Sequence, residues 1–190
     1  MDWFLQLDRS ILDAVQAIRC PFLDAFMPAF SSLCNAGILP ILLALVLLIP
    51  KKTRRIGLTI GVALTLGLIF GNGILKNVVG RVRPYAVDPA LVTEAQLLVA
   101  PLKDWSFPSG HTLAAFEAAV SVRFYSKLWG RVALVIAVLF GFSRLYLYVH
   151  WPSDVLAGAV LGTGFAVAAY YIIRALEPKV LSLIASRKKA

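Results

Sequence analysis

The amino-acid sequence predicts an all-α integral membrane protein with five transmembrane helices, or six if one apolar stretch is divided. Of its 190 residues, 59% are hydrophobic and 15% are charged, whereas soluble domains average about 45–50% and about 25%. The mean hydropathy is +0.80, and a span needs about 20 apolar residues, so only short connections remain. Two Cys and abundant Leu, Val and Ile exclude a disulfide scaffold and a disordered chain. We expect a single domain over residues 1–190.

The first 20 residues predict an amphipathic helix. Apolar side chains recur at helical spacing through this segment, and charged or polar side chains fill the other positions. A basic segment followed by an apolar run and a small-residue cleavage site is missing, so the pattern is not that of a signal peptide. The helix suits the membrane interface, and a helix packed against the edge of the bundle is the alternative.

The remaining apolar segments predict the spans. Residues 21–49 are apolar but interrupted by polar residues and prolines, so we expect one crossing with an irregular or re-entrant start, or two separate helices. Clearer spans follow at 56–79, 112–128, 132–149 and 155–176. The polar, proline-containing connection lies at residues 80–107.

The basic residues predict the orientation. Twelve of the 19 Lys and Arg lie in three places, residues 50–55, residues 123–131 and the tail from Arg174. With five spans these fall on one side, which the positive-inside rule assigns to the cytoplasm. The C-terminus is then cytoplasmic, and the N-terminus and the long connection are extracytoplasmic. The net charge of +9 therefore reflects topology in a lipid bilayer, and we expect no nucleic-acid partner.

Three short blocks hold the unusual polar residues, and this topology places all of them on the outer face. They run from Lys76 to Pro84, from Pro108 to His111, and from Ser143 to Asp154. The first and third supply the cations Lys76, Arg83 and Arg144, which are costly beside hydrocarbon unless an anion compensates them. Arginine forks match phosphate oxygens. Ser109 and Gly110 stand where a helix begins, and free N–H groups there favour an anion.

The two histidines predict a nucleophile and an acid. Asp154 follows His150 at helical spacing, so its carboxylate can orient one ring nitrogen and leave the other free to attack. His111, on another element, is the candidate general acid for the leaving oxygen. Because the sequence has no Cys/His metal spacing, we expect a metal-free mechanism without a cofactor.

These blocks resemble the three signature motifs of the type 2 phosphatidic acid phosphatase family, within the lipid phosphatase/vanadium haloperoxidase superfamily. The matching patterns are Lys-x6-Arg-Pro, Pro-Ser-Gly-His and Ser-Arg-x5-His-x3-Asp, and they cover residues 76–154 in the correct order. The resemblance implies an acid-phosphatase/vanadium-haloperoxidase-like helical bundle without a metal. It implies that His150 forms a phosphohistidine, that Asp154 orients it and that His111 protonates the leaving group. The implied phosphate-binding residues are Lys76, Arg83, Ser109, Gly110, Ser143 and Arg144.

The resemblance also implies a phosphorylated membrane lipid as substrate. The short chain is similar to bacterial undecaprenyl diphosphate phosphatases, which would place it in the bacterial plasma membrane with its site on the extracytoplasmic face. A phosphatidylglycerophosphate or phosphatidic acid phosphatase is the alternative. A non-catalytic lipid-phosphate binding or transport protein and a vanadate-loaded haloperoxidase fit less well, because an oriented nucleophile exceeds what binding needs and because the chain is so hydrophobic.

Three further polar residues have simpler interpretations. Arg81 lies outside the motif pattern, so we expect a solvated charge. Ser143 can also be an ordinary helix residue. Glu117 lies within the third predicted span, residues 112–128, where a carboxylate is costly. We expect a protonated or hydrogen-bonded structural side chain near Asn72 or Ser121, and a place in the substrate cleft is the alternative.

Overall fold

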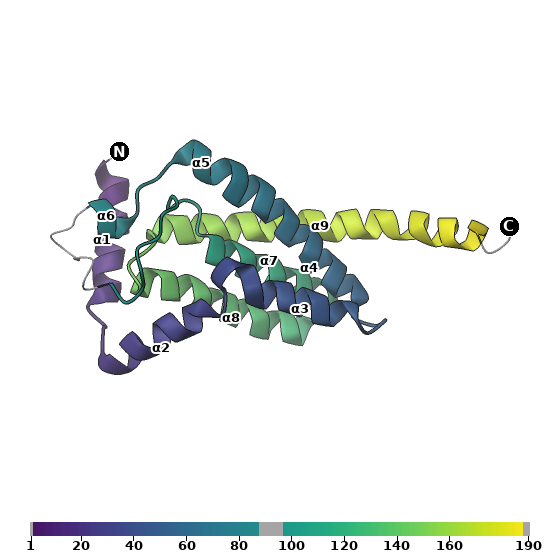
Figure 1. The fold of residues 1–190 in the computed structure, drawn as a ribbon, viewed down its shortest axis with the longest axis horizontal. Helices are drawn as coiled ribbons and strands as arrows, with labels where there is room; N and C mark the ends of the chain where they lie inside the picture. Colours follow the sequence, from purple (N-terminus) through teal and green to yellow (C-terminus); the bar gives the residue numbers. More distant parts are fainter. Residues whose placement is uncertain (1, 88–96, 188–190) are drawn as a thin grey trace.

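The protein is a bundle of helices that lie side by side, with one short helix across its end (Figure 1). The computed structural model describes residues 2–87 and 97–187, and side chains within 3–87 and 97–176. Its elements are α1 (Asp2–Gln16), α2 (Pro21–Ser32), η1 (Asn35–Gly37), α3 (Ile38–Leu48), α4 (Arg54–Leu66), η2 (Gly67–Leu75), α5 (Lys76–Val79), α6 (Pro84–Val87), α7 (Gly110–Tyr125), α8 (Lys127–Tyr146) and α9 (Pro152–Arg187).

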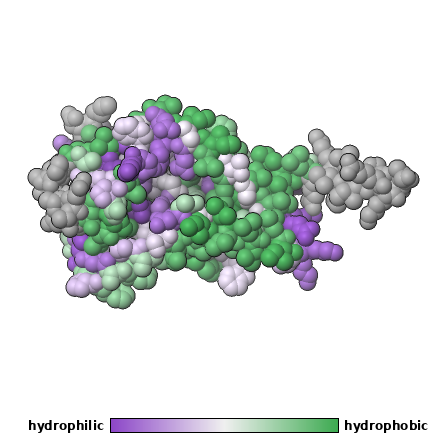
Figure 2. Space-filling model, in the orientation of Figure 1, coloured by the Kyte–Doolittle hydropathy of each residue, from purple (hydrophilic) through white to green (hydrophobic). Residues whose placement is uncertain are grey.

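Four helical segments are long and apolar enough to cross a membrane within the described part of the chain. They are Pro21–Leu48, Arg54–Val87, Lys127–Tyr146 and Pro152–Leu176. Helix α7 has 16 residues and packs mainly against α8 and α9. The surface of the middle of the bundle is hydrophobic, and hydrophilic side chains gather towards its ends (Figure 2). The fold is therefore an all-helical membrane bundle, and a fifth crossing by α7 stays a prediction.

Helix α1 has features of both predicted alternatives, a helix in the membrane interface and a helix packed against the bundle. It lies across the end of the bundle where α9 begins (Figure 1), and Leu12 is fully buried in a cluster with residues of the α8–α9 connection. Trp3 and Phe4 are largely exposed, as expected of a helix in the membrane interface. One side of α1 thus packs on the bundle while apolar side chains remain on another.

The first apolar stretch bends where the sequence predicts an irregular start. Helices α2 and α3 are separated by η1, in which Ala36 and Gly37 have positive φ angles of 49° and 71°. Together they form the 28-residue candidate span. The bend also places η1 against α7, which brings the first span to the motif that begins α7.

The second span departs from the regular helix predicted over 56–79, because residues 67–75 form a π-helix. Close packing against α7 accompanies this wider segment. A Cβ at Gly67 would lie 2.0 Å from Glu117 Oε1, and one at Gly71 would lie 2.7 Å from a Leu113 methyl group. Turns of π-helix are rare and often occur at functional sites. Here the segment ends at Lys76, the first residue of the first motif.

Small residues also let α9 approach α7 closely. A Cβ at Gly158 would lie 2.8 Å from the Ser109 carbonyl oxygen, and one at Gly162 would lie 2.5 Å from that of Leu113. Glycines four residues apart are a common way to bring membrane helices together. This contact sets the start of α7, with the second motif, beside the start of α9, with the third.

Candidate active site

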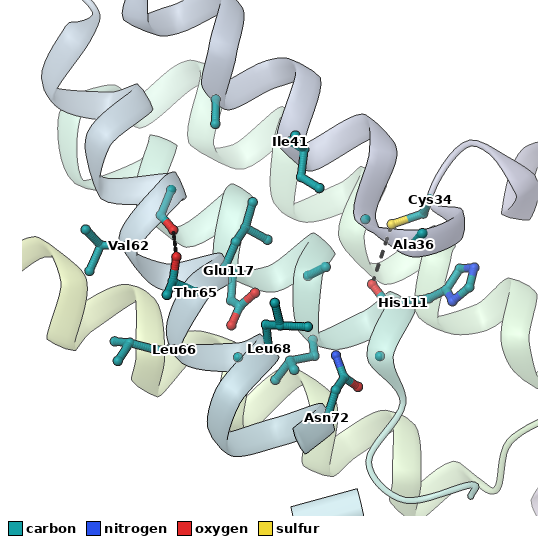
Figure 3. A pocket seen from close by; sticks show the side chains of 18 of the residues that line it. Cys34, Ala36, Ile41, Val62, Thr65, Leu66, Leu68, Asn72, His111 and Glu117 are labelled. Atoms are coloured by element: carbon teal, nitrogen blue, oxygen red, sulfur yellow. Dashed lines mark hydrogen bonds between the residues drawn. The ribbon is translucent and has the colours of Figure 1, made fainter. Parts of the chain in front are cut away.

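The three motif blocks meet around one cavity at the end of the bundle. Its volume is about 920 Å³, and it continues from the motif residues down between α3, α4, η2 and α7. Figure 3 shows this cavity with His111 and Asn72 towards one end and the Glu117 side chain deeper inside. The motif residues that line it are Lys76, Arg83, Gly110, His111, Arg144 and His150. Ser109, Ser143 and Asp154 are fully buried and are not among the lining residues.

The three predicted cations are buried together at the polar end of the cavity. Lys76, Arg83 and Arg144 are 8%, 4% and 3% exposed. Asp104 bridges the first two, with its Oδ2 2.6 Å from Lys76 Nζ and its Oδ1 2.8 Å from Arg83 Nη2. Arg144 donates from Nη1 to Ser31 Oγ at 2.6 Å, but its buried Nε has no hydrogen-bond partner among the described residues. An unpaired buried guanidinium donor beside two other cations is suited to an anion.

His150 faces Asp154, as the spacing of the two residues predicts. Its Nε2 lies 3.3 Å from Arg83 Nη1, and its Nδ1 faces Asp154 Oδ2 at 3.6 Å. Burial lowers the pKa of His150 to about 3. The hydrogen bond and charge of Asp154 act against this shift, and the positive charges of Arg83 and Arg144 add to it. The imidazole is therefore neutral, which is the form that can act as a nucleophile.

Two residues that the sequence interpretation did not select complete this geometry. Ser106 donates its hydroxyl to Asp154 Oδ2 and lies 3.5 Å from His150 Nδ1. Asp104 pairs with the cations as described above. Both lie in the polar connection shortly before Pro108, where the second motif begins. This position is the only feature of the sequence that could have indicated them.

The interpretation of Arg81 as a solvated charge is wrong. Its Nη1 donates to Asp154 Oδ1 at 2.7 Å and to Ser153 Oγ at 2.6 Å, and its Nη2 pairs with Asp8 Oδ2 at 2.7 Å. The prediction failed because the partner Asp8 lies on α1, 73 residues earlier in the chain. No local pattern links these two positions.

The second motif is fixed by contacts from three directions. His111 Nε2 lies 3.0 Å from Asn35 Oδ1 of η1. The Ser109 backbone N–H donates to the Asp154 carbonyl oxygen at 3.1 Å, and its Oγ accepts from Thr112 Oγ1 at 3.0 Å. A Cβ at Gly110 would lie 3.1 Å from Asn72 Oδ1. The Ser109 amide thus joins the second motif to the third, and Gly110 keeps the cavity open at the helix start.

The structure gives Ser143 a contact within its own helix and places Glu117 at the cavity. Ser143 is buried and donates its hydroxyl to the Phe140 carbonyl oxygen at 2.7 Å, which is the geometry of an ordinary helix residue. Glu117 lines the cavity, and its buried Oε1 has no partner among the described residues. A hydrogen bond to Asn72 or Ser121 is absent from the described contacts, and the position of Glu117 at the cavity agrees with the cleft alternative.

No group of three or more His, Cys, Asp and Glu side chains that could hold a metal ion occurs in the described ranges. The arrangement instead offers an oriented imidazole, a second histidine and three buried cations at the mouth of a largely apolar cavity. Residues 56–178 match the family model of the PAP2 superfamily. The chain belongs to this superfamily.

Individual relatives within the superfamily differ in the lipid that their names specify. The chain is 38% identical over 118 residues to an undecaprenyl-diphosphatase of Sulfolobus acidocaldarius, an alignment that covers 62% of this chain and 55% of that protein. It is 27% identical to a lipid A 4'-phosphatase of Bacteroides thetaiotaomicron, over 91% of this chain and 79% of that protein. The crystal structure of a transmembrane PAP2 type phosphatidylglycerolphosphate phosphatase from Bacillus subtilis superimposes with a TM-score of 0.72 at 26% identity, covering 95% and 89% of the two chains.

Proposed function

We propose that the protein is a metal-independent membrane lipid phosphatase that works through a phosphohistidine intermediate. The observation that carries this proposal is the set of three buried cations around His150, with the unpaired Arg144 Nε among them. The cavity behind them is lined mainly by apolar side chains, which suits a lipid tail. Membership of the PAP2 superfamily supports the same chemistry.

In this mechanism His150 Nε2 attacks the phosphorus atom, and the bond from phosphorus to the leaving oxygen breaks. His111 gives that oxygen its proton, and then takes a proton from the water that hydrolyses the phosphohistidine. Asp154, behind His150, stabilises the positive imidazole. Lys76, Arg83 and Arg144 stabilise the charge that develops on the phosphoryl oxygens. Ser109, Gly110 and Ser143 complete the proposed phosphate set, with Gly110 at the cavity and the two serines behind it.

For the substrate we propose undecaprenyl diphosphate, which the protein would convert to undecaprenyl phosphate. The 38% identity to a named undecaprenyl-diphosphatase supports this choice. Phosphatidylglycerophosphate is the second candidate, because the superposition on the Bacillus subtilis enzyme covers nearly the whole of both chains. With five spans, the site lies on the extracytoplasmic face of a bacterial plasma membrane and the C-terminus in the cytoplasm.

The test is phosphate release from a panel of both lipids and lipid A in detergent, with EDTA present. We expect turnover by the parent protein and a loss of at least about 10³-fold for His150→Ala. Arg131→Ala changes an exposed cation on α8 and serves as the matched control with parental activity. Turnover that requires a divalent metal, or that survives in His150→Ala, would contradict the mechanism.

A further inference from the structure

A chain of charged groups connects the N-terminal helix to the proposed nucleophile. Asp8 of α1 pairs with Arg81, and Arg81 pairs with Asp154, each at 2.7 Å. Asp8 and Asp154 are 4% and 0% exposed. Arg81 also lies over the Trp151 ring, 5.3 Å from its centroid. Each partner therefore comes from a different part of the chain, and Arg81 is the link between them.

The arrangement uses the two oxygens of Asp154 for different purposes. Oδ2 faces His150 and accepts from Ser106 Oγ and from the Trp151 backbone N–H. Oδ1 accepts from Arg81. Because both oxygens accept hydrogen bonds, the carboxylate cannot rotate freely, and Oδ2 stays beside His150.

Asp8 offsets the positive charge that Arg81 brings to Asp154. One arginine paired with one carboxylate has no net charge, whereas Arg81 with Asp8 and Asp154 has a net charge of one negative unit. Asp8 also accepts from the Ser153 backbone N–H at 2.9 Å and from Ser153 Oγ at 2.5 Å. It thereby satisfies a free N–H in the first turn of α9 and fixes the segment that bears Asp154.

We propose that Arg81 is a positioning residue for hydrolysis and that Asp8 anchors it, so that α1 is part of the catalytic apparatus. Arg81 acts through Asp154 on His150 and lies outside the cavity lining that holds the three phosphate-binding cations. The inference rests on the proposed function. It separates chemistry from phosphate binding, because removing Arg81 disturbs the orientation of the nucleophile while the cations remain.

The experiment measures kcat, KM and inhibition by orthovanadate for Arg81→Ala, Arg81→Lys and Asp8→Asn, with Arg131→Ala as the control. For Arg81→Ala we expect kcat to fall about 10²-fold, the effect of a displacement of about 1 Å. KM and the vanadate inhibition constant stay within about threefold of the parent values, since they report binding. Arg81→Lys keeps an intermediate kcat, because one ammonium group cannot reproduce a fork between two carboxylates.

Asp8→Asn supplies a second readout that general destabilisation does not reproduce. It keeps an acceptor for Ser153 but removes the charge, and we expect it to lower kcat in the parent and to add little in the Arg81→Ala background. If Arg81→Ala fails to fold, Arg81→Lys and Asp8→Asn decide the question. A kcat within about threefold of the parent in these variants, or a parallel loss of vanadate affinity, overturns the positioning role. Absence of turnover in the parent instead refutes the proposed function.

Discussion

Asp104 is expected to compete with the phosphoryl group for two of its three cations. Its carboxylate bridges Lys76 and Arg83. Partial burial raises the pKa of Asp104, but the hydrogen bonds and charges of these two cations outweigh it and lower the value from 3.8 to about 2. Asp104 is therefore ionised at every working pH. Replacing it by asparagine frees both cations for an incoming oxyanion.

The size of this effect follows from the pKa. A fall of this size corresponds to roughly 2.5 kcal/mol of interaction with the charged form. The Asp104 side chain is 53% exposed, so solvent screening leaves about 1 kcal/mol, or about fivefold in a binding constant. We predict that Asp104→Asn lowers the inhibition constant of orthovanadate about fivefold.

The assay is inhibition of phosphate release by orthovanadate at fixed pH and ionic strength. Asp13→Asn is the matched control, because it removes an exposed carboxylate of α1. Its inhibition constant should equal that of the parent. An unchanged or weaker affinity in Asp104→Asn would show that the carboxylate holds the cations in place for the oxyanion, and the competition argument would be refuted.

Two further predictions concern packing and pH. Gly162→Ala places a Cβ 2.5 Å from the backbone carbonyl oxygen of Leu113, so it should lower the free energy of unfolding by about 1–3 kcal/mol, measured by thermal unfolding in detergent. Gly164→Ala in the same helix, with nothing within 4 Å, should not, and equal melting temperatures for the two variants would contradict the reasoning. Because burial lowers the pKa of His150 to about 3, phosphohistidine formation from an aryl phosphate, whose leaving group needs no acid, should show no inflection near pH 6.5. Rapid-quench measurement of the phosphoenzyme across pH tests this, and an inflection there would show that His150 is protonated in the resting site.

The sequence was sufficient for the residues whose chemistry and spacing are local. His150 and Asp154 are four residues apart at the start of a helix, and in the structure Nδ1 of the ring lies 3.6 Å from Oδ2 of the carboxylate. The apolar stretches likewise predicted helices in nearly the observed places. Spacing alone did not predict the π-helix of η2, which lies where Gly67 and Gly71 pack closely against Glu117 and Leu113 of α7.

Residues that act across the fold were beyond local patterns. Arg81 was assigned to solvent because it stands outside the motif, yet it contacts both Asp8 and Asp154. Asp104 and Ser106 carry no recognisable spacing relative to the partners they meet. The roles of such residues depend on contacts between distant parts of the chain, which here come from α1 and from residues 97–107.

The proposed phosphate site contains more positive than negative charge, and this imbalance favours a phosphoryl group as its ligand. Lys76, Arg83 and Arg144 face one carboxylate, Asp104, at the polar end of the cavity, and the Asp154 charge is shared with Arg81. A singly charged carboxylate ligand would reproduce only what Asp104 already supplies. A phosphoryl dianion brings a second charge and additional oxygens, so it can displace Asp104 and still satisfy the Arg144 Nε that has no partner among the described residues. In the proposed mechanism its charge also favours a protonated His111, because it opposes the burial and the charges of Arg144 and Lys76 that lower the pKa of this histidine.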